Sequence, residues 1–186
     1  MNDITNEINR LSSIRNVSLA ANRLSILLKR IDTFRQLSVV AVKGDLSQTF
    51  LLDSLEYLLM KKYIRERTVE KVTFLLGWIG SNRCVNILEK GVGSSRAIVR
   101  RYCVFTLGQI SEKKSARLLI RSMKDRSDNV RRMASTVVGW AGGDFHIPIL
   151  KEEKVISNDK LRIEVQSLLS QLGSNEALRE LAEIVK

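Results

Sequence analysis

A 31-residue period constrains this chain more than any other feature of its sequence. Gly77, Gly108, Gly139 and Ser170 stand 31 residues apart. The residues around each mark repeat with it, as TVEKVTFLLGWIG (68–80), VRRYCVFTLGQIS (99–111), VRRMASTVVGWAG (130–142) and LRIEVQSLLSQLG (161–173). A fixed period of about 20–50 residues is typical of stacked repeats, each of which buries its apolar face only against its neighbours. The period therefore predicts a solenoid.

Each period has room for two helices. Apolar residues recur at helical spacing in the first part, as Val130, Met133, Ala134, Val137, Val138 and Ala141, and as Val99, Tyr102, Cys103, Thr106, Leu107 and Ile110. Second helices are predicted to begin near Asn82, Lys113, Asp144 and Asn175. Each carries an apolar pair in the same register, namely Val85/Leu88, Ala116/Leu119, Ile147/Leu150 and Leu178/Leu181.

Residues 1–66 follow the period poorly, although LSILLKRI and FLLDSLEYLLM have broad apolar faces. We expect helices at 3–13, 16–31, 33–43 and 46–63. A solenoid needs its exposed end covered, so residues 1–66 are interpreted as an N-terminal helical cap of divergent repeats. The alternative is a separate docking element. Four repeats are then expected in residues 67–186, over about 67–96, 97–127, 128–158 and 159–186.

Two further marks recur with the period. The glycine lies inside the first helix, where it costs about 1 kcal/mol relative to alanine. Because glycine recurs at this position despite its cost, we expect a common structural reason, namely a neighbouring helix that lies too close for a Cβ atom. Trp78 and Trp140 share one register, with Gln109 and Gln171 in the other two repeats. Their large apolar area favours packing between repeats.

The pattern VRRxxxxxLGxIs, followed by SARLLIRSMKDRSDNVRR, resembles the short HEAT-like repeats of the phycobilin-lyase type. The resemblance covers residues 67–186. It implies an all-α fold, a right-handed α-solenoid of HEAT-like helix pairs forming an alpha-alpha superhelix. It also implies a structural role for Arg100, Arg131 and Arg162, which would tie adjacent repeats together through carboxylates and helix-end carbonyls. Asp125 matches the family's acidic position, whereas Ser94 and Ile156 replace it in the adjacent repeats.

The net charge of +11 is concentrated in one part of the chain. Residues 96–132 hold 11 Lys and Arg against 3 Asp and Glu, whereas residues 133–186 hold 6 against 8. A local excess of this kind indicates a surface for a partner of opposite charge.

Within that segment, Lys114, Arg117, Arg121 and Lys124 follow one another at i, i+3, i+7 and i+10, which places them on one helical face. Lys113 flanks this stripe. Arg83 and Lys90 take the positions of Lys114 and Arg121 one repeat earlier. The resemblance implies that second helices line the concave surface. These seven residues are therefore the predicted partner-binding site.

Enzymatic and metal-binding signals are weak. His146 is the one histidine and has no cluster of cysteines or carboxylates around it, so we expect no metal site, no cofactor and no catalytic residue. Cys84 and Cys103 fall on apolar positions and are interpreted as reduced core thiols of a cytoplasmic protein. No apolar run is long enough for a membrane span, and MNDITNEINR does not resemble a signal peptide.

These observations favour a non-catalytic adaptor that holds an acidic protein partner on a basic concave surface. The main alternative is a nucleic-acid-binding module that contacts the phosphate backbone without sequence preference. The resemblance also implies a third hypothesis, a repeat-type DNA glycosylase. It is favoured least, because no aspartate here matches that branch's motif. A small-molecule ligand and a membrane partner are not expected.

Overall fold

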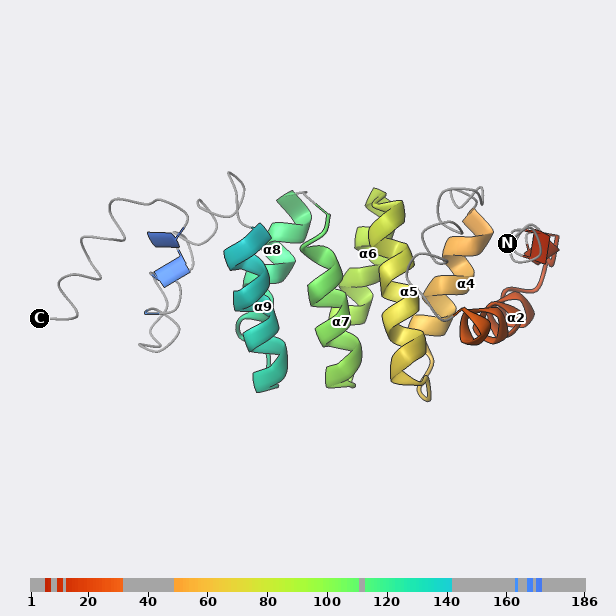
Figure 1. The fold of residues 1–186 in the computed structure, drawn as a ribbon, viewed down its shortest axis with the longest axis horizontal. Helices are drawn as coiled ribbons and strands as arrows, with labels where there is room; N and C mark the ends of the chain where they lie inside the picture. Colours follow the sequence, from red (N-terminus) through yellow and green to blue (C-terminus); the bar gives the residue numbers. More distant parts are fainter. Residues whose placement is uncertain are drawn as a thin grey trace, which may run out of the picture. The chain divides into compact units, whose positions relative to one another are not determined.

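The computed structural model describes residues 6–7, 10–11, 13–31, 49–110, 113–141, 163, 167–168 and 170–171. In this part of the chain there are seven α-helices and no strand (Figure 1). Neighbouring helices pack in contact, so the predicted all-α solenoid class is confirmed. The chain divides into two compact units, Met1–Thr106 and Leu107–Lys186. Among the described residues, no helix is both long and apolar enough to cross a membrane.

The helices follow the 31-residue period. The first helices of successive repeats are α5 (Glu66–Ile79), α7 (Ala97–Leu107) and α9 (Asp128–Ala141), and each begins 31 residues after the one before. The second helices α6 (Asn82–Val92) and α8 (Lys113–Ser122) begin 31 residues apart, at the predicted positions. The helices predicted near Asp144 and Asn175, and the one at 33–43, lie outside the described residues, as does most of 159–186.

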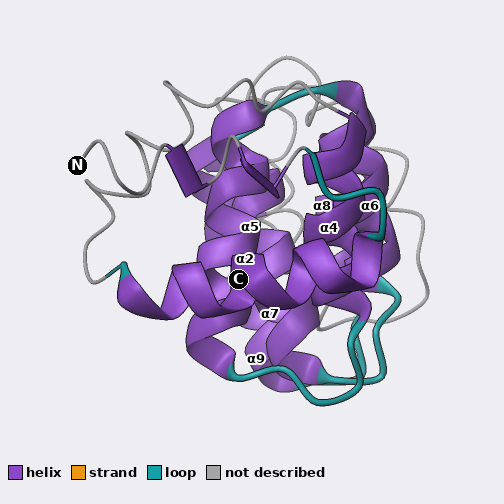
Figure 2. Ribbon diagram, turned by 90° about the vertical axis from the view of Figure 1, so that its right-hand side faces the viewer, coloured by secondary structure: helices purple, strands orange, loops and turns teal. Residues whose placement is uncertain are grey.

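In the first unit, the helices form two layers. Helices α5 and α7 lie in one layer, and α6 lies in the other beside α4 (Thr49–Met60) (Figures 1 and 2). Helix α4 packs against both α5 and α6. It begins 33 residues before α6 and so occupies the place of a second helix, and its buried Leu52 and Leu55 stand where Val85 and Leu88 stand in α6.

Helix α2 (Val17–Arg30) lies crosswise over α4 and α5 (Figure 2). Its first turn is capped by Asn16, whose side-chain oxygen accepts a hydrogen bond from the Leu19 amide at 3.1 Å. Its inner face is fully covered at Ala20, Ala21, Leu24, Leu27 and Leu28. That residues 1–66 form an N-terminal cap stays a prediction.

A buried lysine joins α5 to the end of α2. Lys71 is only 6% exposed, and its ammonium group donates hydrogen bonds to the carbonyls of Leu28, at 2.6 Å, and Ile31. The last carbonyls of a helix have no partners within the helix and carry its partial negative charge. The ammonium satisfies two of them, which explains how a charge is tolerated in the core.

The predicted apolar stripes are buried. Val85 and Leu88 of α6 are 0% exposed, and Ala116 and Leu119 of α8 are at most 1% exposed. The predicted series of the two first helices is buried at Val99, Cys103, Thr106, Leu107, Ile110, Val130, Ala134, Val137 and Val138. Its other members, Tyr102, Met133 and Ala141, are only half-buried. Cys84 and Cys103 are free and buried, as expected, and burial raises the pKa of the Cys103 thiol, which keeps it protonated.

Two of the recurring glycines, Gly108 and Gly139, depart from the expectation. At Gly139, an added Cβ would lie 3.4 Å from Gln171 Oε1 and 3.5 Å from Leu168 Cδ2, which is ordinary contact, so no close approach excludes a side chain there. Gly108 lies just beyond the last residue of α7 rather than inside it. Gly80 ends α5 in the left-handed conformation, with φ 60°, and its amide donates to the Leu76 carbonyl.

The close approach occurs instead at Gly91, near the end of α6. A Cβ there would lie 2.3 Å from Cys103 Sγ of α7 and 3.1 Å from Leu59 Cδ2 of α4. Both neighbours are buried, so neither can move away freely. Gly91 is therefore the position where α6 meets two helices without room for a side chain.

We predict that Gly91→Ala destabilises the protein by about 1–3 kcal/mol, because the added methyl group overpacks the contact with Cys103. Urea unfolding followed by circular dichroism measures the change. In a Cys103→Ala background the same substitution should cost less, since the atom nearest to the new Cβ is gone.

Gly139→Ala is the matched control. It adds a methyl group inside α9, where the nearest atoms leave room for it. Since alanine is favoured over glycine within a helix, it should stabilise the protein by about 0.5–1 kcal/mol. Equal losses at Gly91 and Gly139 would contradict the assignment of the close approach to Gly91.

Candidate binding surface

Helix α8 has one buried and one charged face. Ala116, Leu119 and Ile120 are at most 1% exposed, and α8 packs against α9. The opposite face presents Lys114, Arg117, Arg121 and, just beyond the last turn, Lys124, and all four are exposed. These four residues are thus solvent-exposed, and their role in partner binding stays a prediction. The side chain of Lys113 lies outside the described residues.

The charge on this face is poorly compensated at its centre. Within the described part of the chain, the guanidinium groups of Arg117 and Arg121 form neither ion pairs nor hydrogen bonds. They stand four residues apart, a spacing at which like charges destabilise a helix by about 0.2–0.5 kcal/mol. No acidic residue occurs within α8 to offset this repulsion.

The two predicted site residues on α6 have different surroundings. Arg83 forms an ion pair with Asp53 of α4, and Lys90 forms one with Glu56 of α4. Both pairs belong to the first unit, whereas α8 belongs to the second. The local charge around Arg83 and Lys90 is therefore lower than the sequence alone indicated.

Two other arginines of the basic segment are structural. Arg100 is 4% exposed and donates from Nη1 to the carbonyls of Ser94, at 2.8 Å, and Ser95, at 3.1 Å, in the turn that joins α6 to α7. Arg131 makes the equivalent bond to the Asp125 carbonyl at 2.8 Å. Both arginines thus make carbonyl contacts of the kind that the resemblance implied, whereas the implied carboxylate ties between adjacent repeats stay a prediction. Arg162 lies outside the described residues.

Three arginines of α7 and α9, namely Arg101, Arg131 and Arg132, pair with carboxylates. Arg101 donates to Glu66 Oε1 at 3.3 Å, beside the Tyr102 hydroxyl, which donates to the same oxygen at 3.2 Å. Burial, reinforced by the nearby carboxylates, raises the pKa of Tyr102, so its hydroxyl remains a donor. Asp128 pairs with Arg132 at 2.5 Å and with Arg131 at 3.0 Å. Among the described arginines of the segment 96–132, Arg96, Arg117 and Arg121 have no carboxylate partner among the described residues, and the last two lie on α8.

The two tryptophans are more exposed than the expected packing between repeats would suggest. Trp78 is 52% exposed and Trp140 is 53% exposed. Trp78 contacts Phe74 of its own helix, with 6.1 Å between ring centroids. Trp140 lines a groove of about 780 Å³ with Arg131, Arg132 and Ile163. Both indoles are thus half exposed, and the groove that Trp140 lines extends to residues of the following repeat.

The described residues contain no group of three or more His, Cys, Asp or Glu side chains placed to hold a metal ion. His146 lies outside them.

We predict that Arg117→Glu stabilises the protein, because the new carboxylate faces Lys114 at i−3 and Arg121 at i+4. Each such pair contributes about 0.2–0.5 kcal/mol in a helix. Urea unfolding should rank the residues at this position as Glu, then Gln, then Arg. Because these charges are exposed, the differences in stability between the three proteins should shrink at high salt. If the unsubstituted protein is as stable as Arg117→Glu at low salt, the proposed repulsion between Arg117 and Arg121 is contradicted.

Comparison with known families supports the repeat assignment. Residues 85–168, somewhat less than half of the chain, match the family model of HEAT repeats. The match begins within α6 and includes α7, α8 and α9. It does not distinguish the phycobilin-lyase type from other HEAT repeats. No curated protein sequence matches the chain significantly.

Proposed function

We propose that this chain, whose residues 85–168 are HEAT repeats, is a non-catalytic binding protein that holds an acidic segment of a partner protein on α8. The observation that carries the proposal is the exposed face of Lys114, Arg117, Arg121 and Lys124, with no partner for either central guanidinium in the described structure. The like charges of Arg117 and Arg121 repel each other, and no acidic residue within α8 relieves this repulsion. A partner that supplies carboxylates would relieve it.

The chemistry of arginine supports a protein partner. A guanidinium offers a planar set of donors that matches a carboxylate in two parallel hydrogen bonds. Charge complementarity of this kind selects the partner and speeds its association. HEAT repeats are commonly scaffolds for protein interaction and are typically non-catalytic.

The outer parts of the predicted site have a smaller role in the proposal. Lys113 precedes the exposed face, and Arg83 and Lys90 extend the register one repeat earlier. Because Arg83 and Lys90 already pair with α4, they could contribute to partner binding only by exchanging Asp53 and Glu56 for the partner's carboxylates. A cytoplasmic location is part of the proposal, since buried free thiols suit a reducing compartment.

Nucleic acid is the second candidate partner. Trp140 lies half exposed in the groove that contains Arg131 and Arg132. An aromatic ring beside arginines is suited to stacking on a base while the cations contact phosphates. The exposed ring therefore favours unpaired bases as the nucleic-acid ligand of this groove.

We predict that Arg117→Glu with Arg121→Glu lowers the affinity for a short fluorescein-labelled oligoglutamate peptide by at least about tenfold, as reversal of paired charges at an interface does. Fluorescence anisotropy measures the binding, and circular dichroism verifies the fold. The affinity of the unsubstituted protein should fall as salt is added.

Arg15→Glu with Arg67→Glu is the matched control. It reverses two exposed arginines outside α8 with the same change in net charge. If both double variants lose affinity equally, general charge attraction explains the binding and the assignment to α8 fails. If labelled duplex or single-stranded DNA binds more tightly than oligoglutamate at low salt and again at high salt, nucleic acid replaces the acidic protein as the partner.

A further inference from the structure

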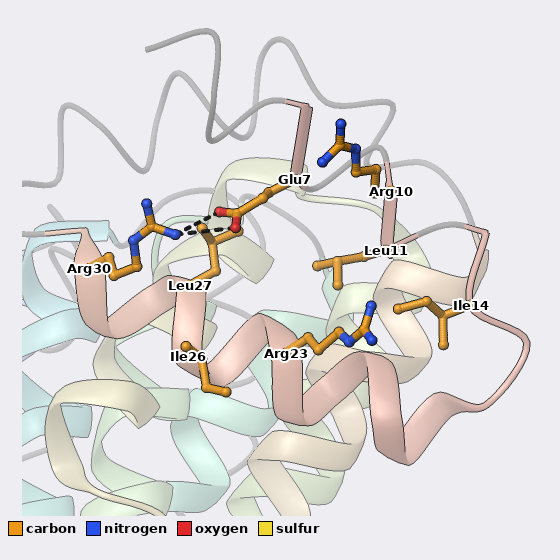
Figure 3. A pocket seen from close by; sticks show the side chains of 8 residues that line it. All are labelled: Glu7, Arg10, Leu11, Ile14, Arg23, Ile26, Leu27 and Arg30. Atoms are coloured by element: carbon orange, nitrogen blue, oxygen red, sulfur yellow. Dashed lines mark hydrogen bonds and ion pairs between the residues drawn. The ribbon is translucent and has the colours of Figure 1, made fainter.

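A cavity of about 300 Å³ lies in the first unit, between α2 and the residues just before it. Figure 3 shows Arg23, Leu27 and Arg30 of α2 facing Glu7 and Leu11 of the N-terminal segment. The cavity is at the lower end of the size range of small-molecule sites. It belongs to neither α8 nor the groove beside Trp140.

The inner wall of the cavity is apolar. Leu11 and Leu27 contribute buried side chains, 7% and 4% exposed. Ile14 and Ile26 add to the apolar lining of the cavity. The aliphatic side chain of Ile26 is 59% exposed to solvent. An exposed isoleucine beside a hollow leaves apolar area that a ligand could cover.

The polar groups around the cavity are mainly cationic. Glu7 accepts two hydrogen bonds from Arg30, at 3.0 and 3.2 Å, so this pair is internally compensated. The guanidinium groups of Arg10 and Arg23 have no ion pair or hydrogen bond among the described residues. The cavity therefore joins an apolar wall to two cations that lack a counter-charge.

We infer that this cavity binds a small amphiphilic carboxylate, a molecule with an aliphatic body and one carboxylate group. The aliphatic body would cover Leu11, Leu27 and Ile26, and the carboxylate would pair with Arg23, assisted by Arg10. Arginine suits this role because its donors match both carboxylate oxygens. Nothing in the sequence pattern predicted such a ligand, and the inference does not depend on the function proposed for α8.

Decanoate is a suitable probe, used below its micelle-forming concentration in isothermal titration calorimetry of the whole chain. We expect one molecule to bind per chain, and Arg23→Gln to weaken binding by about tenfold or more, as loss of a charged hydrogen bond does. Decan-1-ol, which lacks the charge, should bind more weakly than decanoate.

Arg67→Gln provides the matched control, since Arg67 is exposed on α5 and does not line the cavity. It should leave decanoate binding unchanged, as should Arg117→Glu with Arg121→Glu, because α8 takes no part. The inference is overturned if decanoate does not bind, if decan-1-ol binds equally well, or if Arg67→Gln weakens binding as much as Arg23→Gln. Because Arg23 is exposed, its substitution should leave the fold intact, which circular dichroism verifies.

Discussion

The structure depends on the burial of apolar stripes that recur every 31 residues. A helix pair of this size cannot cover its own apolar face, so each depends on its neighbours, as the complete burial of Val85 and Leu88 illustrates. Polar contacts then fix the connections between helices. Arg100 holds the turn from α6 to α7 through two carbonyls, and Lys71 holds the end of α2 against α5. At Gly91 the helices are too close for a side chain.

The placement of each charge is more informative than the net charge. Some of the basic residues are part of the fold, as Arg100 is, and others are compensated, as Arg83 and Lys90 are by α4. Arg117 and Arg121 are neither, and they stand where an acidic residue would have stabilised α8. Positions that retain a local cost without a structural gain are candidates for function, which is why the proposed binding face is centred on these two arginines.

Features that depend on local periodicity could be predicted from the sequence. The starts of α6 and α8, the buried residues of α7 and α9, and the exposure of Lys114, Arg117, Arg121 and Lys124 all follow from helical spacing within one repeat.

Features that depend on contacts between distant segments could not be predicted from the sequence. Lys71 meets carbonyls about 40 residues away, and the cavity beside Arg23 needs the N-terminal segment to fold back over α2. The exposure of Trp78 and Trp140 was missed because a shared register does not reveal which side of a helix faces a neighbour.

The most direct test of the central claim is an NMR titration of the ¹⁵N-labelled protein with an acidic peptide, observing the arginine Nε–Hε signals together with the backbone amides. The account predicts that the signals of Arg117 and Arg121 shift most, that the amides of Lys113–Ser122 follow, and that the signals of the structural Arg100 do not move. If the largest shifts fall outside α8, or if saturating peptide moves no arginine signal on this helix, α8 is not the binding face.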